Sequence, residues 1–119
     1  MKINSIVIDD NDDVREVFAE LLQINDIDVI GTGCNGKEAV ELYQKHTPDV
    51  VFMDVMMPEY DGSYGLKNIK EYDPNAIVVL VTGSVNVGIQ LDNCNATAII
   101  AKPIDIDKIK SVVNKFCIH

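Results

Sequence analysis

The chain has 119 residues, of which 47% are hydrophobic, enough for one buried core with little room for a second. Its formal net charge of -9 repels phosphate backbones and anionic lipid surfaces, which argues against direct binding of nucleic acid or membrane. We therefore expect one domain over residues 1–119, with proteins as its partners.

Signals for secretion and for disulfide bonding are weak. Few apolar residues precede Asp9, so we expect neither a signal-peptide core nor a transmembrane span. The cysteines are odd in number and far apart in the sequence, which favours reduced thiols that are buried or half-buried. They are Cys34, Cys94 and Cys117. A cytoplasmic location is the expectation.

Short β-branched runs alternate with segments of helical period, which predicts repeated strand-helix units around a parallel sheet. The first run ends at the acidic pair Asp9-Asp10, and a helix is expected directly after it. The apolar face of that helix is predicted to consist of Val14, Val17, Phe18 and Leu21. A strand over 27–33 follows, and Asn35 with Glu38 resembles a capping box that opens a helix through Tyr43.

The second half of the chain repeats this alternation. Apolar runs end at Asp54, at Thr82 and at Lys102-Pro103. A helix containing Leu66 follows the first of these runs, and a weaker helix is expected over 84–95, where Gly and β-branched residues lower the propensity. Asp105 is predicted to cap the last helix. The apolar face of that helix is predicted to consist of Ile106, Ile109, Val113 and Phe116.

Polar residues at the ends of parallel strands gather at one edge of the sheet, where open α/β sheets bind ligands. Asp9, Asp10 and Asp54 would meet there, and two like charges 4 Å apart repel by about 4 kcal/mol at an effective dielectric near 20. Either protons remain bound or a hard cation offsets the repulsion, and oxygen ligands of this kind suit Mg²⁺. Lys102 and Thr82 add a cationic donor and a hydroxyl donor for phosphate. Asp54 is the candidate nucleophile, since a carboxylate can form an aspartyl phosphate.

Together these motifs resemble those of response-regulator receiver domains, including the chemotaxis regulators, over the whole chain. The matching segments are Asp9-Asp10, Asp54-Val55-Met56-Met57-Pro58 with Asp61-Gly62, Thr82-Gly83, and Lys102-Pro103. The resemblance implies a doubly wound, flavodoxin-like α/β fold. Its sheet would have five parallel strands in the order 2-1-3-4-5, with helices on both faces. It also implies a cis bond before Pro103.

The resemblance further implies a signalling regulator of a two-component system, which is not an enzyme acting on other substrates. Asp54 would accept a phosphoryl group from a phosphohistidine of a histidine kinase or phosphotransfer domain. Asp10 and Asp54 would ligate Mg²⁺ through carboxylates, Asp9 through bound water, and Met56 through its backbone carbonyl.

By the same resemblance, Thr82 would be the switch hydroxyl and Lys102 the cation that pairs with the phosphate. The fourth helix, fifth strand and fifth helix would then bind a downstream protein target. The chain would be a monomer or a weak dimer, either a stand-alone receiver or a receiver excised from a longer protein.

Two positions bear on how such a domain would signal. Ile99 stands where the family usually has the aromatic residue that takes part in the switch, so the aromatic half of that switch is absent or replaced. By the same resemblance, Met56 would flank the phosphoryl group. Its apolar side chain cannot orient an attacking water, which predicts spontaneous dephosphorylation that is not especially fast.

Two alternatives stay open at this point. The segment from Asp10 to Val14 also matches the DxDxV motif of haloacid-dehalogenase-like phosphatases, in which Asp10 would be the nucleophile. The other alternative is a receiver fold that serves only as an interaction module, without phosphotransfer.

Overall fold

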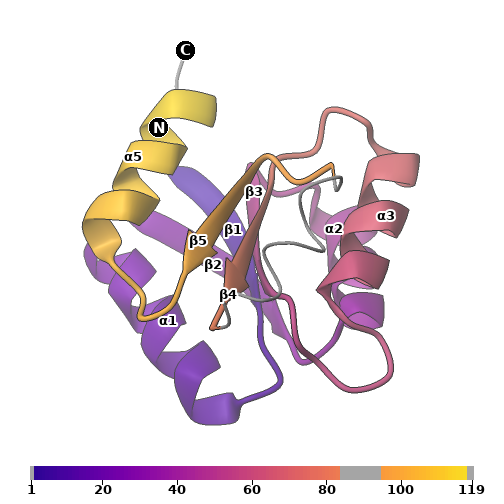
Figure 1. The fold of residues 1–119 in the computed structure, drawn as a ribbon. Helices are drawn as coiled ribbons and strands as arrows, with labels where there is room; N and C mark the ends of the chain where they lie inside the picture. Colours follow the sequence, from indigo (N-terminus) through magenta and orange to yellow (C-terminus); the bar gives the residue numbers. More distant parts are fainter. Residues whose placement is uncertain (1, 84–94, 118–119) are drawn as a thin grey trace.

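The computed structural model describes residues 2–83 and 95–117 (Figure 1). The helix predicted over 84–95 lies outside the described residues apart from its last position, and Cys94 lies outside them as well. None of the helices in the described part of the chain has the length and apolar content that a bilayer span requires.

Five parallel strands form one sheet in the order β2-β1-β3-β4-β5, as the family resemblance implies. The strands are β1 (Ile3–Ile8), β2 (Ile27–Gly33), β3 (Val50–Asp54), β4 (Val78–Thr82) and β5 (Ala98–Ala101). Because β1 lies between β2 and β3, the chain reverses its direction of travel across the sheet after β2. The carboxyl ends of β1 and β3 are therefore neighbours at the point where this fold class binds ligands.

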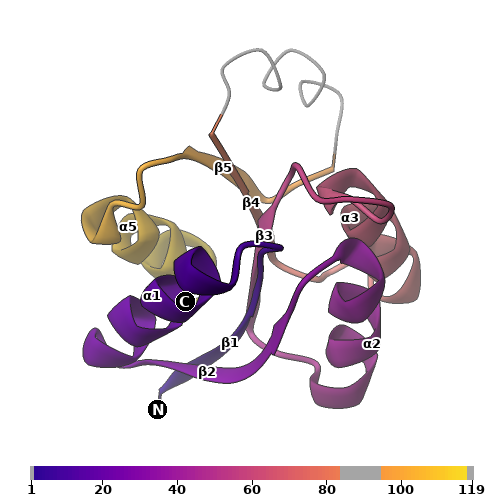
Figure 2. The same cartoon turned by 90° about the horizontal axis from the view of Figure 1, so that it is seen from below.

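The described helices cover both faces of the sheet. They are α1 (Asp12–Ile24), α2 (Gly36–His46), α3 (Gly62–Tyr72) and α5 (Ile106–Phe116). Figure 2 shows α1 and α5 on one face and α2 and α3 on the other. The chain therefore has the doubly wound α/β architecture expected from its alternating strand and helix signals.

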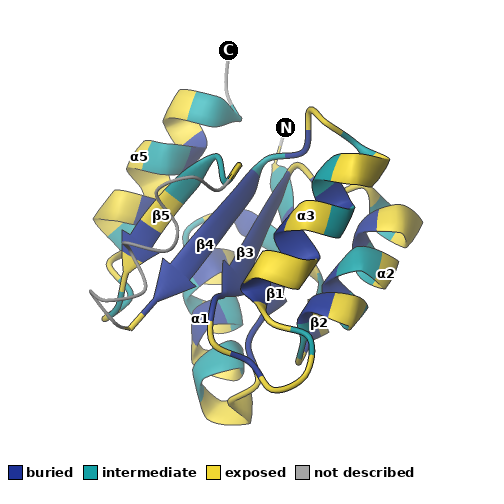
Figure 3. Cartoon of the chain, turned by 45° about the vertical axis from the view of Figure 1, so that its right-hand side comes forward, coloured by how far each residue is buried: buried dark blue, intermediate teal, exposed yellow. Residues whose placement is uncertain are grey.

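Burial on both faces explains why the central strands are continuous apolar runs. Every residue of β3 and β4 is buried (Figure 3). Successive side chains point to opposite faces, so Phe52 packs against Phe18 of α1 at 5.4 Å between ring centroids, while Met53 belongs to the core under α2 and α3. Asp54 extends this strand, and its carboxylate is consequently held by a rigid, fully packed element.

Side-chain caps fix where each described helix begins. Asn11, Asn35, Asp61 and Asp105 each accept a hydrogen bond from a backbone N–H in the first turn. The capping box of α2 differs from the expectation. Glu38 accepts from the N–H of Cys34, at 2.8 Å, and not from that of Asn35. Asp61, which the sequence marks as a turn residue, is thus the cap of α3.

The structure corrects two further details. Val17 is 61% exposed, and Leu22 is buried in its place, because Phe18 and Leu22, four residues apart, form the side of α1 that faces the sheet. Cys34 is exposed, contrary to the expected burial, since it lies in the loop that follows β2. The half-buried Cys117 agrees with the expectation.

Candidate functional site

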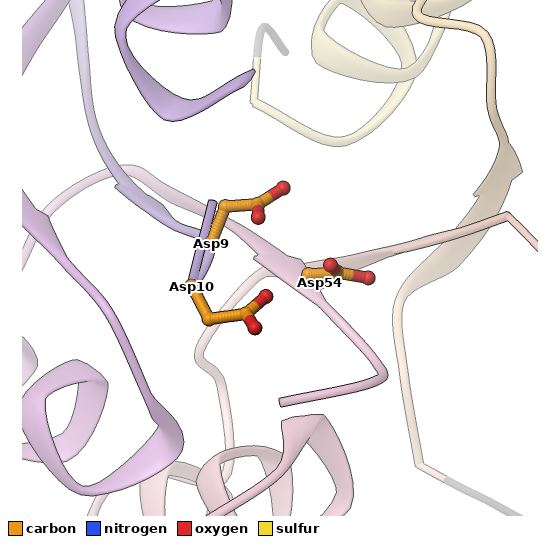
Figure 4. A group of neighbouring side chains, drawn as sticks. All are labelled: Asp9, Asp10 and Asp54. Carbon is orange, nitrogen blue, oxygen red and sulfur yellow. The ribbon is translucent and has the colours of Figure 1, made fainter. Parts of the chain in front are cut away.

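Three carboxylates meet at the carboxyl edge of β1 and β3. Asp54 is the last residue of β3, and Asp9 and Asp10 directly follow β1. One oxygen from each carboxylate lies within 4.8 Å of the others, and Figure 4 shows Asp10 pointing toward Asp54. Asp9 and Asp54 are buried, whereas Asp10 is exposed. The structure therefore brings together the three acidic residues that the sequence singles out.

Lys102 is the cation inside this cluster. Its Nζ lies 3.3 Å from Oδ2 of Asp9 and 3.3 Å from Oδ2 of Asp54. The lysine follows β5, and its backbone N–H donates to the backbone carbonyl of Thr82 at 2.7 Å, which connects Lys102 to the end of β4. The Lys102-Pro103 peptide is cis, as the resemblance implies.

Burial and charge act against one another at these residues. Burial raises the pKa of Asp54 above its ordinary value of 3.8, Lys102 opposes this rise, and the charge on Asp9 adds to it. Burial alone would lower the pKa of Lys102, but the charges of Asp54 and Asp9 outweigh it, so that pKa is raised above 10.5. Lys102 therefore stays protonated at neutral pH, so the site keeps its cation.

The other predicted site residues lie around this cluster. Thr82 is buried at the end of β4, on the strand that pairs with β3. Met56 lies two residues after Asp54, and its side chain is 64% exposed, so it borders the site on the solvent side. Ile99 lies in β5 with 43% of its surface exposed, on the outer strand and outside the acidic cluster.

Sequence reasoning missed a contributor to the site. Arg15, in the first turns of α1, donates from Nη1 to the backbone carbonyl of Asp9 at 2.8 Å and from Nη2 to Oδ1 of Asp12 at 2.6 Å. The sequence held one signal, because Arg15 is the single arginine of the chain and stands five residues after Asp10. Helical periodicity places it among polar residues of α1 and gives no reason to connect it with the site.

An apolar groove opens beside the cluster, between α1 and the segment that follows β5. It is lined by Asp13, Val14, Val17, Leu21, Lys102, Pro103 and Ile104. Lys102 thus contacts the two buried carboxylates through its ammonium group and lines this groove. The exposure of Val17 leaves an apolar side chain accessible next to the acidic site.

The donor set fits a hard divalent cation. Carboxylate oxygens are ligands that Mg²⁺ prefers, and it commonly binds one or two carboxylates together with water and phosphate oxygens. Here two buried carboxylates and one exposed carboxylate lie within 4.8 Å, and the exposed one leaves a side open to solvent. The positions are therefore suited to Mg²⁺ with part of its water shell retained.

Comparisons with known proteins agree with this geometry. The model of the response regulator receiver domain family matches residues 6–114. The chain is 34% identical over 112 residues to the chemotaxis protein CheY of Bacillus subtilis, which covers 92% of this chain and 93% of that protein. It is 31% identical over 114 residues to the regulatory protein AtoC of Escherichia coli, which covers 92% of this chain but only 24% of that longer protein.

Solved structures give the same result. The response regulator TrrA of Thermotoga maritima, in complex with Mg²⁺ and beryllofluoride, superposes with a TM-score of 0.88 at 28% identity, covering 98% of this chain and 99% of that one. The CheX-CheY-BeF3-Mg complex of Borrelia burgdorferi matches with a TM-score of 0.84 at 29% identity, covering 95% of this chain and 87% of that one. By its fold, its acidic site and these relatives, the chain belongs to the receiver domain family of two-component response regulators.

Proposed function

We propose that Asp54 is the phosphoacceptor of this receiver and takes its phosphoryl group from a phosphohistidine of a histidine kinase or phosphotransfer domain. The observation that carries this proposal is the position of Asp54, a buried carboxylate at the end of a central strand. It lies 3.3 Å from the Lys102 ammonium and in one cluster with Asp9 and Asp10. A carboxylate in this position has a cation beside it to offset the charge of a phosphoryl group.

The transfer exchanges one bond for another. The phosphorus–nitrogen bond of the donor breaks, its electron pair stays on the imidazole nitrogen, and a carboxylate oxygen of Asp54 forms the new bond to phosphorus. Such transfers need positioning and neutralisation of the phosphoryl oxygens more than covalent help from the protein. The Lys102 ammonium neutralises charge on the phosphoryl oxygens, and the rigid β3 strand positions Asp54. In this sense the domain catalyses its own phosphorylation and dephosphorylation.

Magnesium belongs to the proposal as the cofactor. Asp9, Asp10 and Asp54 would hold it, together with the backbone carbonyl of Met56, with Asp9 acting through water. When bound, Mg²⁺ supplies the positive charge that offsets both the clustered carboxylates and the phosphoryl oxygens. Two related structures are complexes with Mg²⁺ and beryllofluoride, which supports the assignment by likeness.

The signal would leave the site through Thr82 and the surface around β5. Thr82 is the proposed switch hydroxyl, because it ends the strand next to β3 and its carbonyl accepts the N–H of Lys102. The proposed target-binding face combines β5 and α5 with the segment 84–95, for which the sequence predicts a helix and which lies outside the described residues apart from its last position. Ile99 gives this face an exposed aliphatic side chain in the position where the family usually has an aromatic one. Target binding would therefore rely on apolar contact without a ring or hydroxyl at that point.

The phosphodonor would dock at the groove between α1 and the segment after β5. This groove opens beside Lys102, and its apolar lining includes the exposed Val17. Lys102, which lines this groove, lies 3.3 Å from Asp54, so a donor bound in the groove would be next to the phosphoacceptor. We further propose that residues 1–119 act as one receiver unit in the cytoplasm, as a monomer or weak dimer, without direct contact to nucleic acid or membrane.

The test is the intact mass of the protein after incubation with Mg²⁺ and acetyl phosphate, compared with the Asp54→Asn and Asp10→Asn variants. Asp61→Asn is the matched control, because it removes an acidic charge nearby while asparagine preserves the helix cap. We expect one phosphoryl adduct that requires Mg²⁺, is absent in Asp54→Asn and persists in Asp61→Asn.

Two results would overturn the proposal. No adduct on the unsubstituted chain would favour a receiver fold used only for interaction. An adduct that survives Asp54→Asn and is lost in Asp10→Asn would move the nucleophile to Asp10, as in the haloacid-dehalogenase-like phosphatases.

A further inference from the structure

Arg15 connects the helix that borders the site to the backbone of an acidic residue in the site. Its guanidinium donates to the carbonyl of Asp9 at 2.8 Å and to the carboxylate of Asp12 at 2.6 Å. The Arg15 side chain is only 21% exposed, whereas that of Asp12 is 85% exposed. Most of the arginine is thus packed against the protein, and its inner contact is the one to Asp9.

This contact completes a set of bonds around the loop between β1 and α1. The N–H of Asp9 donates to the Gly33 carbonyl at 3.0 Å, which ties Asp9 to the end of β2. Oδ1 of Asp9 accepts from the N–H of Asn11 at 2.9 Å, and Asn11 caps α1. The carbonyl of Asp9 is the start of the peptide that carries Asp10, and Arg15 is the group that holds this carbonyl.

We propose that Arg15 is a positioning residue, which orients the Asp9-Asp10 peptide so that the Asp10 carboxylate faces Asp54. The inference rests on the proposed function, since the arrangement it preserves is the one assigned to Mg²⁺. The planar guanidinium forms two hydrogen bonds in fixed directions. The bond to Asp12 lies within the first turn of α1 and holds the guanidinium in place, and the bond to the Asp9 carbonyl joins that turn to the loop. Asp10 is exposed, so little packing can replace this support.

A role of Arg15 through its charge and a role through orienting the loop predict opposite changes in Mg²⁺ affinity when Arg15 is removed. If Arg15 acted only through its positive charge, its removal would reduce repulsion of a bound divalent cation and tighten Mg²⁺ binding. If Arg15 acts by orienting the loop, its removal weakens Mg²⁺ binding. Outer partners of metal ligands typically change affinity by about 10- to 100-fold, and an indirect contact through the backbone should give about tenfold. The direction of the change therefore separates the two roles.

The experiment measures the Mg²⁺ dissociation constant by calorimetric titration at constant ionic strength, for the unsubstituted chain and for Arg15→Met and Arg15→Lys. Methionine keeps most of the aliphatic stem, and lysine keeps the charge without the two-pronged donor geometry. We expect both variants to bind Mg²⁺ about tenfold more weakly. Phosphorylation by acetyl phosphate should recover as the Mg²⁺ concentration is raised.

Lys2→Met is the matched control, because Lys2 pairs with Asp28 on an exposed surface at the opposite end of β1. It removes the same charge and should leave the dissociation constant unchanged. Denaturant unfolding without Mg²⁺ checks that each variant is folded at the titration temperature, so that weakened binding is not a loss of folded protein.

Unchanged or tighter binding in Arg15→Met would overturn the inference while leaving Asp54 as the phosphoacceptor. Full recovery of affinity in Arg15→Lys would also overturn it, since the two-pronged donor geometry of the guanidinium would then not be needed. Failure of the unsubstituted chain to bind Mg²⁺ would overturn the proposed function, and this inference with it.

Discussion

Replacing Asp10 by Asn should stabilise the metal-free protein and weaken its response to Mg²⁺. Asp10 is the exposed member of the acidic cluster, and it faces Asp9 and Asp54 within 4.8 Å. The Lys102 ammonium contacts those two neighbours. The substitution thus removes repulsion from two carboxylates and leaves the ion pairs of Lys102 in place.

The size of the effect follows from the separation of the charges. At 4.8 Å, two like charges repel by about 0.9 kcal/mol in water and by about 3.5 kcal/mol at an effective dielectric of 20. Asp10 is exposed, so the value in water is the better guide, and two neighbours give about 2 kcal/mol. The carboxylate also lies near the start of α1, where the helix dipole favours it by about 0.3–1 kcal/mol. The expected net stabilisation is about 1 kcal/mol, or about 4 °C in Tm for a chain of this size.

Urea unfolding with EDTA and then with excess Mg²⁺ measures both parts of this prediction. At 100 times the dissociation constant, Mg²⁺ should stabilise the unsubstituted chain by about 2.7 kcal/mol. Asp10→Asn should gain much less, so the order of stability reverses. Asp13→Asn is the control, because it removes an exposed charge from the first turn of α1, outside the cluster. The reasoning is refuted if Asp10→Asn is no more stable than the unsubstituted chain without metal, or if Mg²⁺ stabilises both equally.

Three further predictions concern other parts of the molecule. A hydrogen bond from the Tyr43 hydroxyl lowers the pKa of Asp73 below 3.8, and a smaller contribution comes from the backbone N–H of Asn75. Ionised Asp73 therefore stabilises the folded state above pH 3.8, and this stabilisation is lost as the pH falls through the lower folded-state pKa. Tyr43→Phe should therefore flatten the acid side of the stability curve in urea unfolding across pH 2–6, and an unchanged slope would contradict this. Val17→Glu should slow phosphorylation by a phosphohistidine protein about tenfold and leave phosphorylation by acetyl phosphate unchanged; equal slowing of both would exclude a docking role. Met56→Asn should speed decay of the phosphorylated protein by about tenfold or less, which is below the rate gain of about 10²- to 10⁴-fold from a positioned general base. A rapid decay that the substitution leaves unchanged would refute the role of Met56.

The fold was predictable because each local signal agreed with the others. Apolar runs such as 50–53 are buried on both faces, which is the pattern of central parallel strands, and polar caps such as Asn35 and Asp105 mark where helices begin. The strand order came from the resemblance, since periodicity alone cannot say which strands are neighbours. The exposure of Val17 was not predictable, because an apolar residue that lines a surface groove has the same spacing as one that lines the core.

The site was predictable where its chemistry resides in side chains at strand ends. Asp9, Asp10 and Asp54 each follow an apolar run, and parallel topology alone brings such residues to one edge. The contact of Arg15 was not predictable, since it is made to a backbone carbonyl, and every residue has one. Contacts of this kind depend on the path of a loop, which sequence patterns do not specify.

The charge of the site explains why it suits a switch. In formal charges, three carboxylates that lie within 4.8 Å of one another face one ammonium, and two of these carboxylates are buried. Such an arrangement costs stability, and the packed strands β1 and β3 hold it in place. A phosphoryl group on Asp54 would add further negative charge beside Lys102, whose ammonium is already shared between Asp9 and Asp54. The Lys102 side chain would then shift toward the phosphoryl group. Because the backbone N–H of Lys102 donates to the Thr82 carbonyl, this shift would displace the ends of β4 and β5. In the proposed switch, the route from charge to surface would begin at the contact between Lys102 and Thr82, and that first step would not need an aromatic residue at the position of Ile99.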